Sequence, residues 1–318
     1  MKEQAVLFGE SNPLVGVVAD PAAENDRPRP AVILLNPGIV HRVGPGRIYV
    51  KIARALAAAG FVVLRFDFAG IGDSAVRCDK VPFPTSAIQE AQAAMDFLHT
   101  TRGIADFILM GGCSGATVSL DVACHDRRVI GSVLMNFPVF DEEDEDNNPQ
   151  FHNRNAAHYY WNIALFNLKS WHKLLTGKAS YGQLIRTLAF QVKQRIRPHR
   201  QPSQEAITLR AKLKSLSERS VPIHFIYSES DRRLDDLRDA LGSEFKRLCA
   251  PRKARLSVIP RADHTFSSLH DHALLLPILL EQVSVIIEGE ARNKAEAPVL
   301  PGTDTVSSVN LGDIVATP

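Results

Sequence analysis

Residues 106–120 read DFILMGGCSGATVSL, and this stretch decides the predicted fold. An apolar run ends at paired glycines, and small residues with a helical pattern follow. The order predicts a buried strand, a tight turn and a helix. Glycines flank turns of this kind because side chains there would collide with the neighbouring strand and helix. The segment therefore matches a nucleophile elbow, G-x-Nu-x-G, in which the turn exposes one reactive side chain.

Two reading frames of this elbow place different nucleophiles in the turn. GGCSG over 111–115 matches G-x-C-x-G completely, with Cys113 as nucleophile. GCSGA over 112–116 matches only as G-x-S-x-A, with Ser114 as the alternative nucleophile. The glycine positions favour Cys113. The competing interpretation gives this cysteine no catalytic role: it would be an inert residue at a glycine-rich strand end, because free cysteine often packs as a small core residue.

Apolar strands alternate with amphipathic helices on both sides of the elbow. Such alternation predicts an α/β fold with an open, mostly parallel sheet and helices on both faces. Two strands are expected within residues 4–20, and further strands at 106–110, 129–139 and the runs AVILLNPG, FVVLRFDF, VPIHFIYSES and ARLSVIP. Helices are expected at 47–59, 86–99, 115–125, 232–248 and 270–288.

The alternation stops after residue 140 and resumes near residue 220. Residues 141–146 are all acidic, and residues 186–219 hold nine Lys or Arg against two Glu. The acidic run and the basic run can form ion pairs with each other. More often, such a charged run is simply the solvent-exposed face of a helix. We predict a core over 1–140 and 220–288, a mostly helical cap over 141–219, and a flexible C-terminal tail over 289–318.

An acid and a histidine follow the elbow in the chain order that a nucleophile, acid and His triad requires. Asp231 comes directly after one predicted strand and His264 after the next, at the sheet edge where open α/β sheets place their sites. His264 would take the proton of the nucleophile as general base, and Asp231 would orient it. Asp231 as a helix N-cap is the competing interpretation. The fallback acids are Glu229, Asp235 and Asp236, whereas Asp263 is expected to point elsewhere.

An acyl-transfer site also needs two N–H donors for the oxyanion. One donor is the backbone N–H of Ser114, which follows the favoured nucleophile. The backbone N–H of Ile39 is the second, in the turn Asn36-Pro37-Gly38-Ile39. The glycines of Asp67 to Ser74 match no phosphate-binding motif, so that segment is interpreted as a structural turn.

These residues resemble the α/β-hydrolase superfamily, over about 1–140 and 220–288. The resemblance is carried by ILLNPG, LRFDFAGIGDS, GGCSGA, the strand end at Asp231 and RADHTF. The block from Asn36 to Ser74 is most similar to the serine-aminopeptidase-like branch. Within it, HRVGPGR and the Cys-containing elbow resemble hydrolases that accompany exosortase-linked systems. The resemblance implies an α/β-hydrolase fold with an eight-stranded, mostly parallel sheet and a helical cap inserted after strand 6. Cys113 and Pro37, where serine and histidine are usual, depart from the family pattern.

A cysteine in such a triad predicts an acyl hydrolase that cleaves esters or thioesters through a covalent acyl-enzyme. An acyltransferase would use the same thioester intermediate. A Ser114 serine esterase and a catalytically silent binding protein of the same fold are the competing interpretations. The expected partner is a small-molecule or carrier-bound acyl substrate, and the basic run over 186–219 could meet a phosphorylated carrier.

Composition limits the remaining function classes. Lys and Arg number 37 against 35 Asp and Glu, so the net charge of +2 gives no reason to expect nucleic acid. Four scattered cysteines form no CxxC pair, which predicts no metal site and reduced thiols in a cytoplasmic protein. The apolar run over 273–280 contains Pro277 and is far shorter than the ~20 residues of a membrane span, and MKEQAVLFGE lacks a signal-peptide core. No cofactor is expected, and the oligomeric state is left open.

Overall fold

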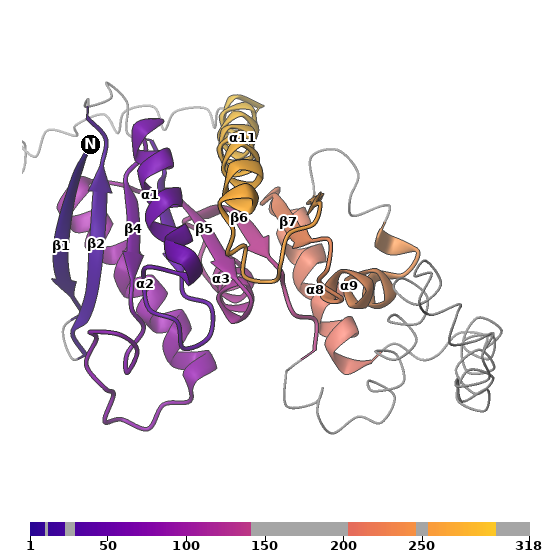
Figure 1. Cartoon of the computed structure of the whole chain (residues 1–318), viewed down its shortest axis with the longest axis horizontal. Helices are drawn as coiled ribbons and strands as arrows, with labels where there is room; N and C mark the ends of the chain where they lie inside the picture. The colour runs from indigo at the N-terminus through magenta and orange to yellow at the C-terminus, as the bar shows by residue number, and fades with distance from the viewer. Residues whose placement is uncertain (10–11, 23–28, 141–202, 246–253, 297–318) are drawn as a thin grey trace, which may run out of the picture.

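The computed structural model describes residues 1–9, 12–22, 29–140, 203–245 and 254–296. Within them, eight strands form one sheet in the order β1-β2-β4-β3-β5-β6-β7-β8 (Figure 1). The strands are β1 (Lys2–Phe8), β2 (Leu14–Asp20), β3 (Ala31–Leu35), β4 (Val63–Phe66), β5 (Phe107–Gly112), β6 (Val129–Met135), β7 (Ile223–Ser228) and β8 (Ala254–Ile259). β2 pairs antiparallel with β1 and β4, and all other pairs are parallel. The predicted mostly parallel, eight-stranded sheet is confirmed.

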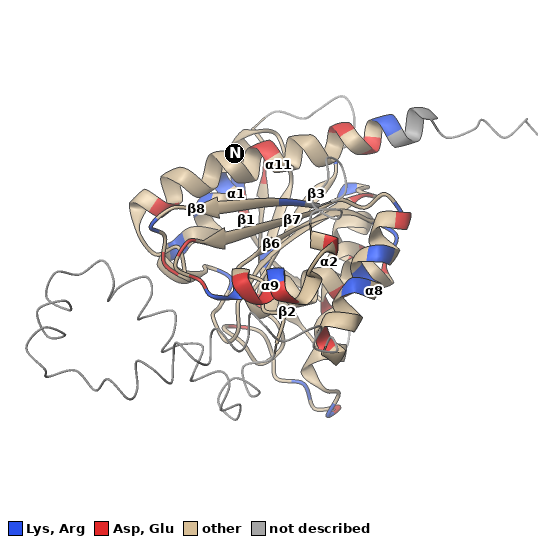
Figure 2. Ribbon diagram, turned by 90° about the vertical axis from the view of Figure 1, so that its right-hand side faces the viewer, with Lys and Arg blue, Asp and Glu red and all other residues tan. Residues whose placement is uncertain are grey.

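Helices cover both faces of this sheet (Figure 2). α1 (Ile48–Ala58), which follows a short 3₁₀ turn at Pro45–Arg47, packs on one face together with α11 (Leu269–Glu296). The opposite face is covered by α2 (Phe83–Arg102), α3 (Ser114–His125), α8 (Gln204–Glu218) and α9 (Arg233–Leu241). Each helix buries its apolar residues against the strands, so two hydrophobic layers enclose the sheet.

The central strand β3 shows why these strands appear as continuous apolar runs. Val32 and Leu34 face the layer of α1 and α11, while Ile33 and Leu35 face the opposite layer. All four side chains are fully buried. A strand covered by helices on both faces has no solvent side, so its sequence is apolar throughout instead of alternating.

α8 is a core helix, although the sequence assigned residues 141–219 to the cap. Leu209, Leu213 and Leu216 are buried in the layer that also contains α3 and α9. Arg219 follows the helix and donates to the carbonyl of Ala123, at the end of α3. This spacing of leucines gives α8 one apolar face, and that face packs on the core. The rest of the predicted cap, up to residue 202, lies outside the described residues.

α11 is longer than predicted, because it runs to Glu296 and not to residue 288. The predicted tail over 289–318 therefore starts too early: the Glu, Ala and Lys residues after Gly289 are good helix formers. Residues 297–318 lie outside the described part. Pro277 lies within the helix and does not end it.

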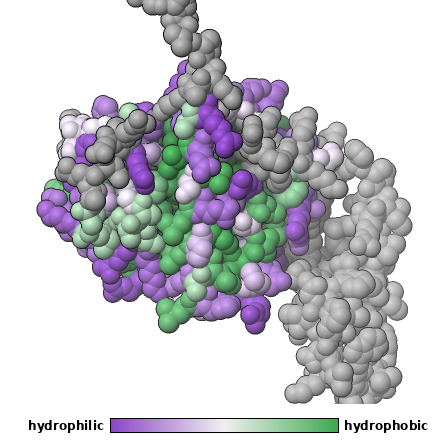
Figure 3. Space-filling view, turned by 90° about the horizontal axis from the view of Figure 1, so that it is seen from above, coloured by the Kyte–Doolittle hydropathy of each residue, from purple (hydrophilic) through white to green (hydrophobic). Residues whose placement is uncertain are grey.

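By length and composition alone, Leu269–Arg292 within α11 is apolar enough to cross a membrane. Its residues Leu275, Leu279, Val283 and Ile286 are buried in the layer that covers the sheet. Viewed onto this face of the molecule, hydrophobic residues gather along the middle and hydrophilic residues surround them (Figure 3).

If α8 is a core helix, truncating its buried face must destabilise the whole core. Leu213→Ala removes a side chain that is 3% exposed, and we expect a loss of about 2–5 kcal/mol in the free energy of unfolding. Ile207 lies on the same helix and is 45% exposed, so Ile207→Ala is the matched control, with a change within about 0.5 kcal/mol. Urea denaturation followed by circular dichroism measures both. Equal midpoints for the two variants would contradict the assignment of α8 to the core.

Candidate active site

The turn between β5 and α3 has the geometry of the predicted elbow. Cys113 lies between the last residue of the strand and the first residue of the helix, at φ 50° and ψ −124°. This conformation is strained for a residue with a Cβ atom. Cys113 N–H donates to the carbonyl of Met135 at 2.9 Å, which ties the turn to the end of β6. The strained position belongs to Cys113, while Ser114 already has its place in the helix.

Two close approaches explain the glycines around Cys113. A Cβ atom at Gly111 would lie 2.1 Å from the carbonyl oxygen of Gly115. A Cβ atom at Gly115 would lie 2.4 Å from the carbonyl oxygen of Leu35. At Gly112 the nearest atom would be 3.5 Å away. The two positions that exclude side chains thus flank Cys113, as in the G-x-C-x-G frame.

Ser114 points toward the loop that follows β3. Its Oγ accepts a hydrogen bond from the N–H of Gly38 at 2.7 Å. The hydroxyl therefore connects the elbow to the turn predicted to supply the second oxyanion donor. In the described part of the chain, the N–H groups of Ser114 and Ile39 have no hydrogen-bond acceptor. The assignment of these two N–H groups as oxyanion donors remains a prediction.

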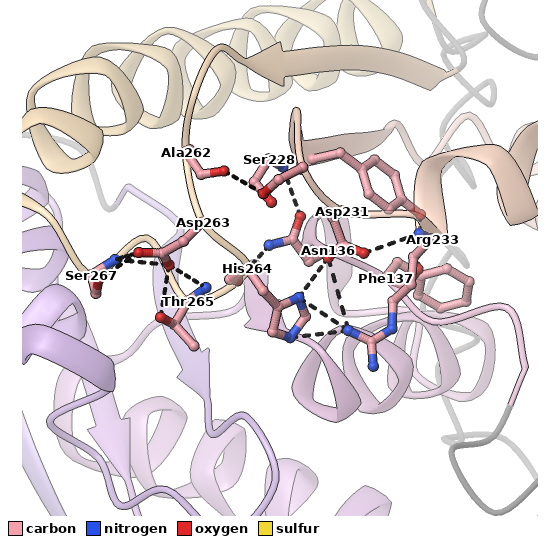
Figure 4. A network of polar contacts seen from close by, with 12 residues as sticks. Asn136, Phe137, Ser228, Asp231, Arg233, Ala262, Asp263, His264, Thr265 and Ser267 are labelled. Carbon is pink, nitrogen blue, oxygen red and sulfur yellow. Dashed lines mark hydrogen bonds and ion pairs between the residues drawn. The ribbon is translucent and has the colours of Figure 1, made fainter. Parts of the chain in front are cut away.

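The structure brings Cys113, His264 and Asp231 together. His264 Nδ1 lies 2.5 Å from Asp231 Oδ2 (Figure 4). The imidazole also forms a hydrogen bond with Cys113. Asp231 follows β7 and is nearly buried, whereas the His264 side chain is 40% exposed. Asp231 also accepts a hydrogen bond from the backbone N–H of Arg233 at 3.0 Å. The carboxylate thus binds His264 and also accepts the first N–H of α9, whose N-cap residue is Arg232 and not Asp231.

The other acids near the site have different partners. Glu229 accepts a hydrogen bond from the Arg261 N–H, and Asp235 forms an ion pair with Arg238 on the surface of α9. Asp263 accepts hydrogen bonds from Thr265 and Ser267, which lowers the pKa of its carboxyl to about 2 against the opposing effect of burial (Figure 4). The remaining fallback acid, Asp236, is buried on α9.

The surroundings of His264 raise its pKa to about 9. The hydrogen bond with Asp231 is the largest cause, and the hydrogen bond with Cys113 is the second. Burial and the nearby guanidinium of Arg233 oppose them. Burial alone would raise the pKa of Asp231, but its hydrogen bonds with His264 and the Arg233 N–H bring it below the ordinary value. The pair is therefore arranged to hold an imidazolium against a carboxylate.

Arg233 is a site residue that sequence reasoning missed. Its Nη1 lies 3.0 Å from both ring nitrogens of His264 and 3.8 Å from Asp231 Oδ2. The positive charge of Arg233 therefore lies next to the imidazole, where it repels an imidazolium. The only signal in the sequence was its place two residues after Asp231.

Asn136 holds the loop that carries His264. Its Nδ2 donates to the His264 carbonyl at 2.6 Å, and its Oδ1 accepts from the Ser228 N–H at 2.8 Å (Figure 4). The side chain is buried, and the backbone has a positive φ of 47°. Asparagine tolerates this conformation better than most residues. The ends of β6 and β7 are thereby fixed relative to the histidine.

Asp67 binds two residues of the loop between β3 and α1, so its segment does more than form a turn. The carboxylate is fully buried and accepts hydrogen bonds from the Asn36 side chain and from the N–H and guanidinium of Arg42. Arg42 also forms an ion pair with Asp73 at 2.6 Å. A buried carboxylate needs such partners, because its desolvation is otherwise costly.

Among the described residues, no group of three or more His, Cys, Asp or Glu side chains is arranged to hold a metal ion. Three of the four cysteines lie in this part of the chain. Cys78, Cys113 and Cys124 are all thiols outside any disulfide.

Most of the chain matches one family of known proteins. Residues 32–276 match the profile of the alpha/beta hydrolase family. The chain belongs to the α/β-hydrolase family. The match spans most of the described sheet, from β3 into α11, and includes every residue of the Cys113, His264 and Asp231 cluster. No curated protein sequence matches this α/β hydrolase.

Solved structures share its fold at low sequence identity. The proline iminopeptidase of Mycobacterium smegmatis is 15% identical, with a TM-score of 0.53, over 92% of this chain and 100% of the other. GrgF, an α/β hydrolase from Penicillium, is 16% identical, with a TM-score of 0.56 and the same coverages. An esterase of Pyrococcus furiosus is 13% identical, with a TM-score of 0.50, over 92% of each chain. At these identities the likeness concerns the α/β-hydrolase fold alone.

The close packing around the elbow yields a stability prediction. Gly111→Ala places a Cβ atom against backbone, and we expect a loss of about 3 kcal/mol or more in the free energy of unfolding. Gly112→Ala is the matched control in the adjacent position, where ordinary contacts predict a loss of about 1 kcal/mol or less. Urea denaturation measures both. Similar losses for both variants would contradict the proposed packing.

The charges around His264 yield a prediction for its titration by NMR. We expect a pKa of about 9 in the unaltered protein. Asp231→Asn should lower that pKa, because it removes the largest stabiliser of the imidazolium, and Arg233→Gln should raise it, because it removes a repelling charge. Arg232→Gln removes the same charge one residue away and should change the pKa least. An unchanged pKa in Arg233→Gln would contradict the assigned contact.

Proposed function

We propose that this α/β hydrolase cleaves ester or thioester bonds of acyl compounds through a covalent acyl-enzyme on Cys113. One observation carries the proposal: a cysteine in the strained elbow position is hydrogen-bonded to a histidine, which is bound in turn to a buried aspartate. Thiolates paired with imidazolium attack activated acyl carbons well. The peptidase and esterase among the structural neighbours are compatible with acyl chemistry on this fold.

In the first half-reaction, Cys113 Sγ forms a bond to the acyl carbon. The thiol proton passes to His264, and Asp231 stabilises the resulting imidazolium. The carbonyl oxygen becomes an oxyanion, which accepts hydrogen bonds from the N–H groups of Ser114 and Ile39. Collapse of this intermediate breaks the bond to the leaving group, which takes its proton from His264. A thioester on Cys113 is left.

In the second half-reaction, an acceptor attacks that thioester. His264 removes a proton from water, the acceptor in hydrolysis, and the new oxyanion occupies the same two donors. Collapse expels Cys113 Sγ, which recovers a proton from His264, and releases the carboxylic acid. An alcohol or amine in place of water gives acyl transfer by the same steps. Exclusion of water from the site determines which of the two reactions dominates.

The setting of this reaction is also part of the proposal. The substrate is a small-molecule or carrier-bound acyl compound, and nucleic acid is not a partner. Among the described residues, Cys78, Cys113 and Cys124 form no disulfide, which supports the proposal of a reducing, cytoplasmic location. The resemblance of HRVGPGR and the Cys-containing elbow to hydrolases of exosortase-linked systems supports a role beside such a system.

Ser114 is the alternative nucleophile, but its geometry favours a role in the oxyanion site. It begins α3 at an ordinary helical position, and its Oγ accepts the Gly38 N–H. A hydroxyl engaged in holding the oxyanion loop is poorly placed to attack. We therefore assign Ser114 to the oxyanion site, through its backbone N–H and its contact with Gly38.

A trapping experiment tests the proposed nucleophile. The protein is mixed with p-nitrophenyl butyrate or a butyryl thioester, quenched in acid, and mapped by peptide mass spectrometry. We expect a butyryl thioester on Cys113, and a loss of turnover of about 10⁴-fold or more in Cys113→Ala. Cys78→Ala, which alters an exposed thiol, is the control and should keep both.

Two different results would each favour another function. A butyryl ester on Ser114, with activity retained in Cys113→Ala, would overturn the cysteine assignment and favour a serine esterase. No adduct at either residue, across several acyl lengths, would favour a catalytically silent binding protein.

A further inference from the structure

Tyr49 lies behind the elbow and touches both halves of the proposed oxyanion site. It is the second residue of α1, and its side chain is 2% exposed. Its backbone N–H donates to the carbonyl of Val43, and its ring packs so closely on Gly44 that a Cβ atom there would lie 2.9 Å from it. The loop from Asn36 to Arg47 thus wraps around this tyrosine.

The hydroxyl of Tyr49 bridges two backbone groups of different strands. It donates to the Leu35 carbonyl at 2.8 Å and accepts from the Gly112 N–H at 2.9 Å. Leu35 ends β3 directly before the turn that contains Ile39. Gly112 ends β5 directly before Cys113. One oxygen atom therefore links the strand ends from which both oxyanion donors project.

The direction of these hydrogen bonds depends on a neutral phenol. The hydroxyl has one proton, which it donates to the Leu35 carbonyl. It can therefore only accept a hydrogen bond from the Gly112 N–H, through a lone pair of its oxygen. Burial raises the pKa of Tyr49 well above its ordinary value, which keeps the proton in place. The Gly112 N–H donates to this hydroxyl in a part-buried place, so removing the hydroxyl takes an acceptor away from a donor that water reaches poorly.

We propose that Tyr49 is a positioning residue for acyl transfer: its hydroxyl sets the separation between the Ser114 and Ile39 donors through Gly112 and Leu35. The inference rests on the proposed function, because only a reaction with an oxyanion needs this separation. The Gly38 to Ser114 Oγ contact links the same two segments on the side nearer the donors. The Tyr49 hydroxyl and the hydrogen bond between Gly38 and Ser114 thus both connect the loop after β3 to the elbow. Together they fix the distance between the two donors, which one connection alone would leave variable.

The test compares two reactions of the same thiol in Tyr49→Phe. Acylation of Cys113 by p-nitrophenyl butyrate passes through an oxyanion, whereas alkylation by iodoacetamide does not. We expect the acylation rate to fall about 10- to 100-fold, since small displacements of catalytic groups have effects of this size. Alkylation should change by about twofold or less, because the thiol and His264 keep their contacts. Peptide mass spectrometry measures both rates.

Tyr227→Phe is the matched control. Tyr227 is a second buried tyrosine, and its hydroxyl donates to the Phe137 carbonyl at 2.8 Å, away from β3 and β5. Its loss removes the same kind of hydrogen bond, and the ratio of acylation to alkylation should stay as in the unaltered protein. Gly44→Ala is a second test variant, because the added Cβ displaces the Tyr49 ring while the hydroxyl is kept. It should lower acylation selectively, even if Tyr49→Phe does not fold.

Contrary results would overturn the inference in distinguishable ways. Unchanged acylation in folded Tyr49→Phe, or an equal fall of both rates in both variants, would reduce Tyr49 to a structural role. Failure of the proposed function gives another pattern: the unaltered protein would be alkylated but never acylated at Cys113, which would overturn both proposals.

Discussion

The site depends on the close approach of α3 to the ends of β3 and β5. Gly111 and Gly115 allow this contact, because any side chain there would overlap backbone atoms. The approach forces Cys113 into a positive φ and brings the hydroxyl of Ser114 to the N–H of Gly38 in the turn after β3. The strain is held by the surrounding sheet, in which β3 and β5 are neighbours with every side chain of β3 buried. The tight turn at Cys113 and its contact with the loop after β3 both depend on that approach.

Near this turn, two side chains of opposite charge act on the imidazole of His264. Asp231 stabilises a proton on His264, while the positive charge of Arg233 opposes it. Arg233 also reaches Asp231, so the carboxylate is shared between two cations. The histidine therefore has a partner that favours each of its protonation states. Acid–base catalysis benefits from such a balance, since the same group must accept and release a proton in one cycle.

Much of this arrangement could be predicted from the sequence. Buried strands appeared as apolar runs, and Cys113, Asp231 and His264 appeared as residues that follow strands in the order expected of a triad. Chain-local signals of this kind reach a few residues. The contacts that support the site join residues far apart: Tyr49 and Gly112 are separated by 63 positions, and Asn136 and His264 by 128. No local pattern marks such pairs, so the positioning side chains were missed.

Element ends were missed for a different reason. Residues 289–296 were interpreted through the Pro- and Gly-rich chain that follows them, although their own composition favours a helix. The interpretation of α8 relied on its basic residues and overlooked the leucines on the buried side of the helix. Long charged side chains on one face of a helix say little about its opposite face.

Asn136 has a consequence for how proteins of this shape can diversify. It connects the end of β6 to Ser228, 92 positions later, and to the His264 loop, while residues 141–202 lie in between along the chain. The Asn136 side chain makes this connection across the ends of β6 and β7, so the connection does not run through the intervening segment. Insertions, deletions or wholesale exchange of that segment then leave the cysteine, histidine and aspartate in register. A lineage can alter what reaches the thiol while the groups that react with it stay in place.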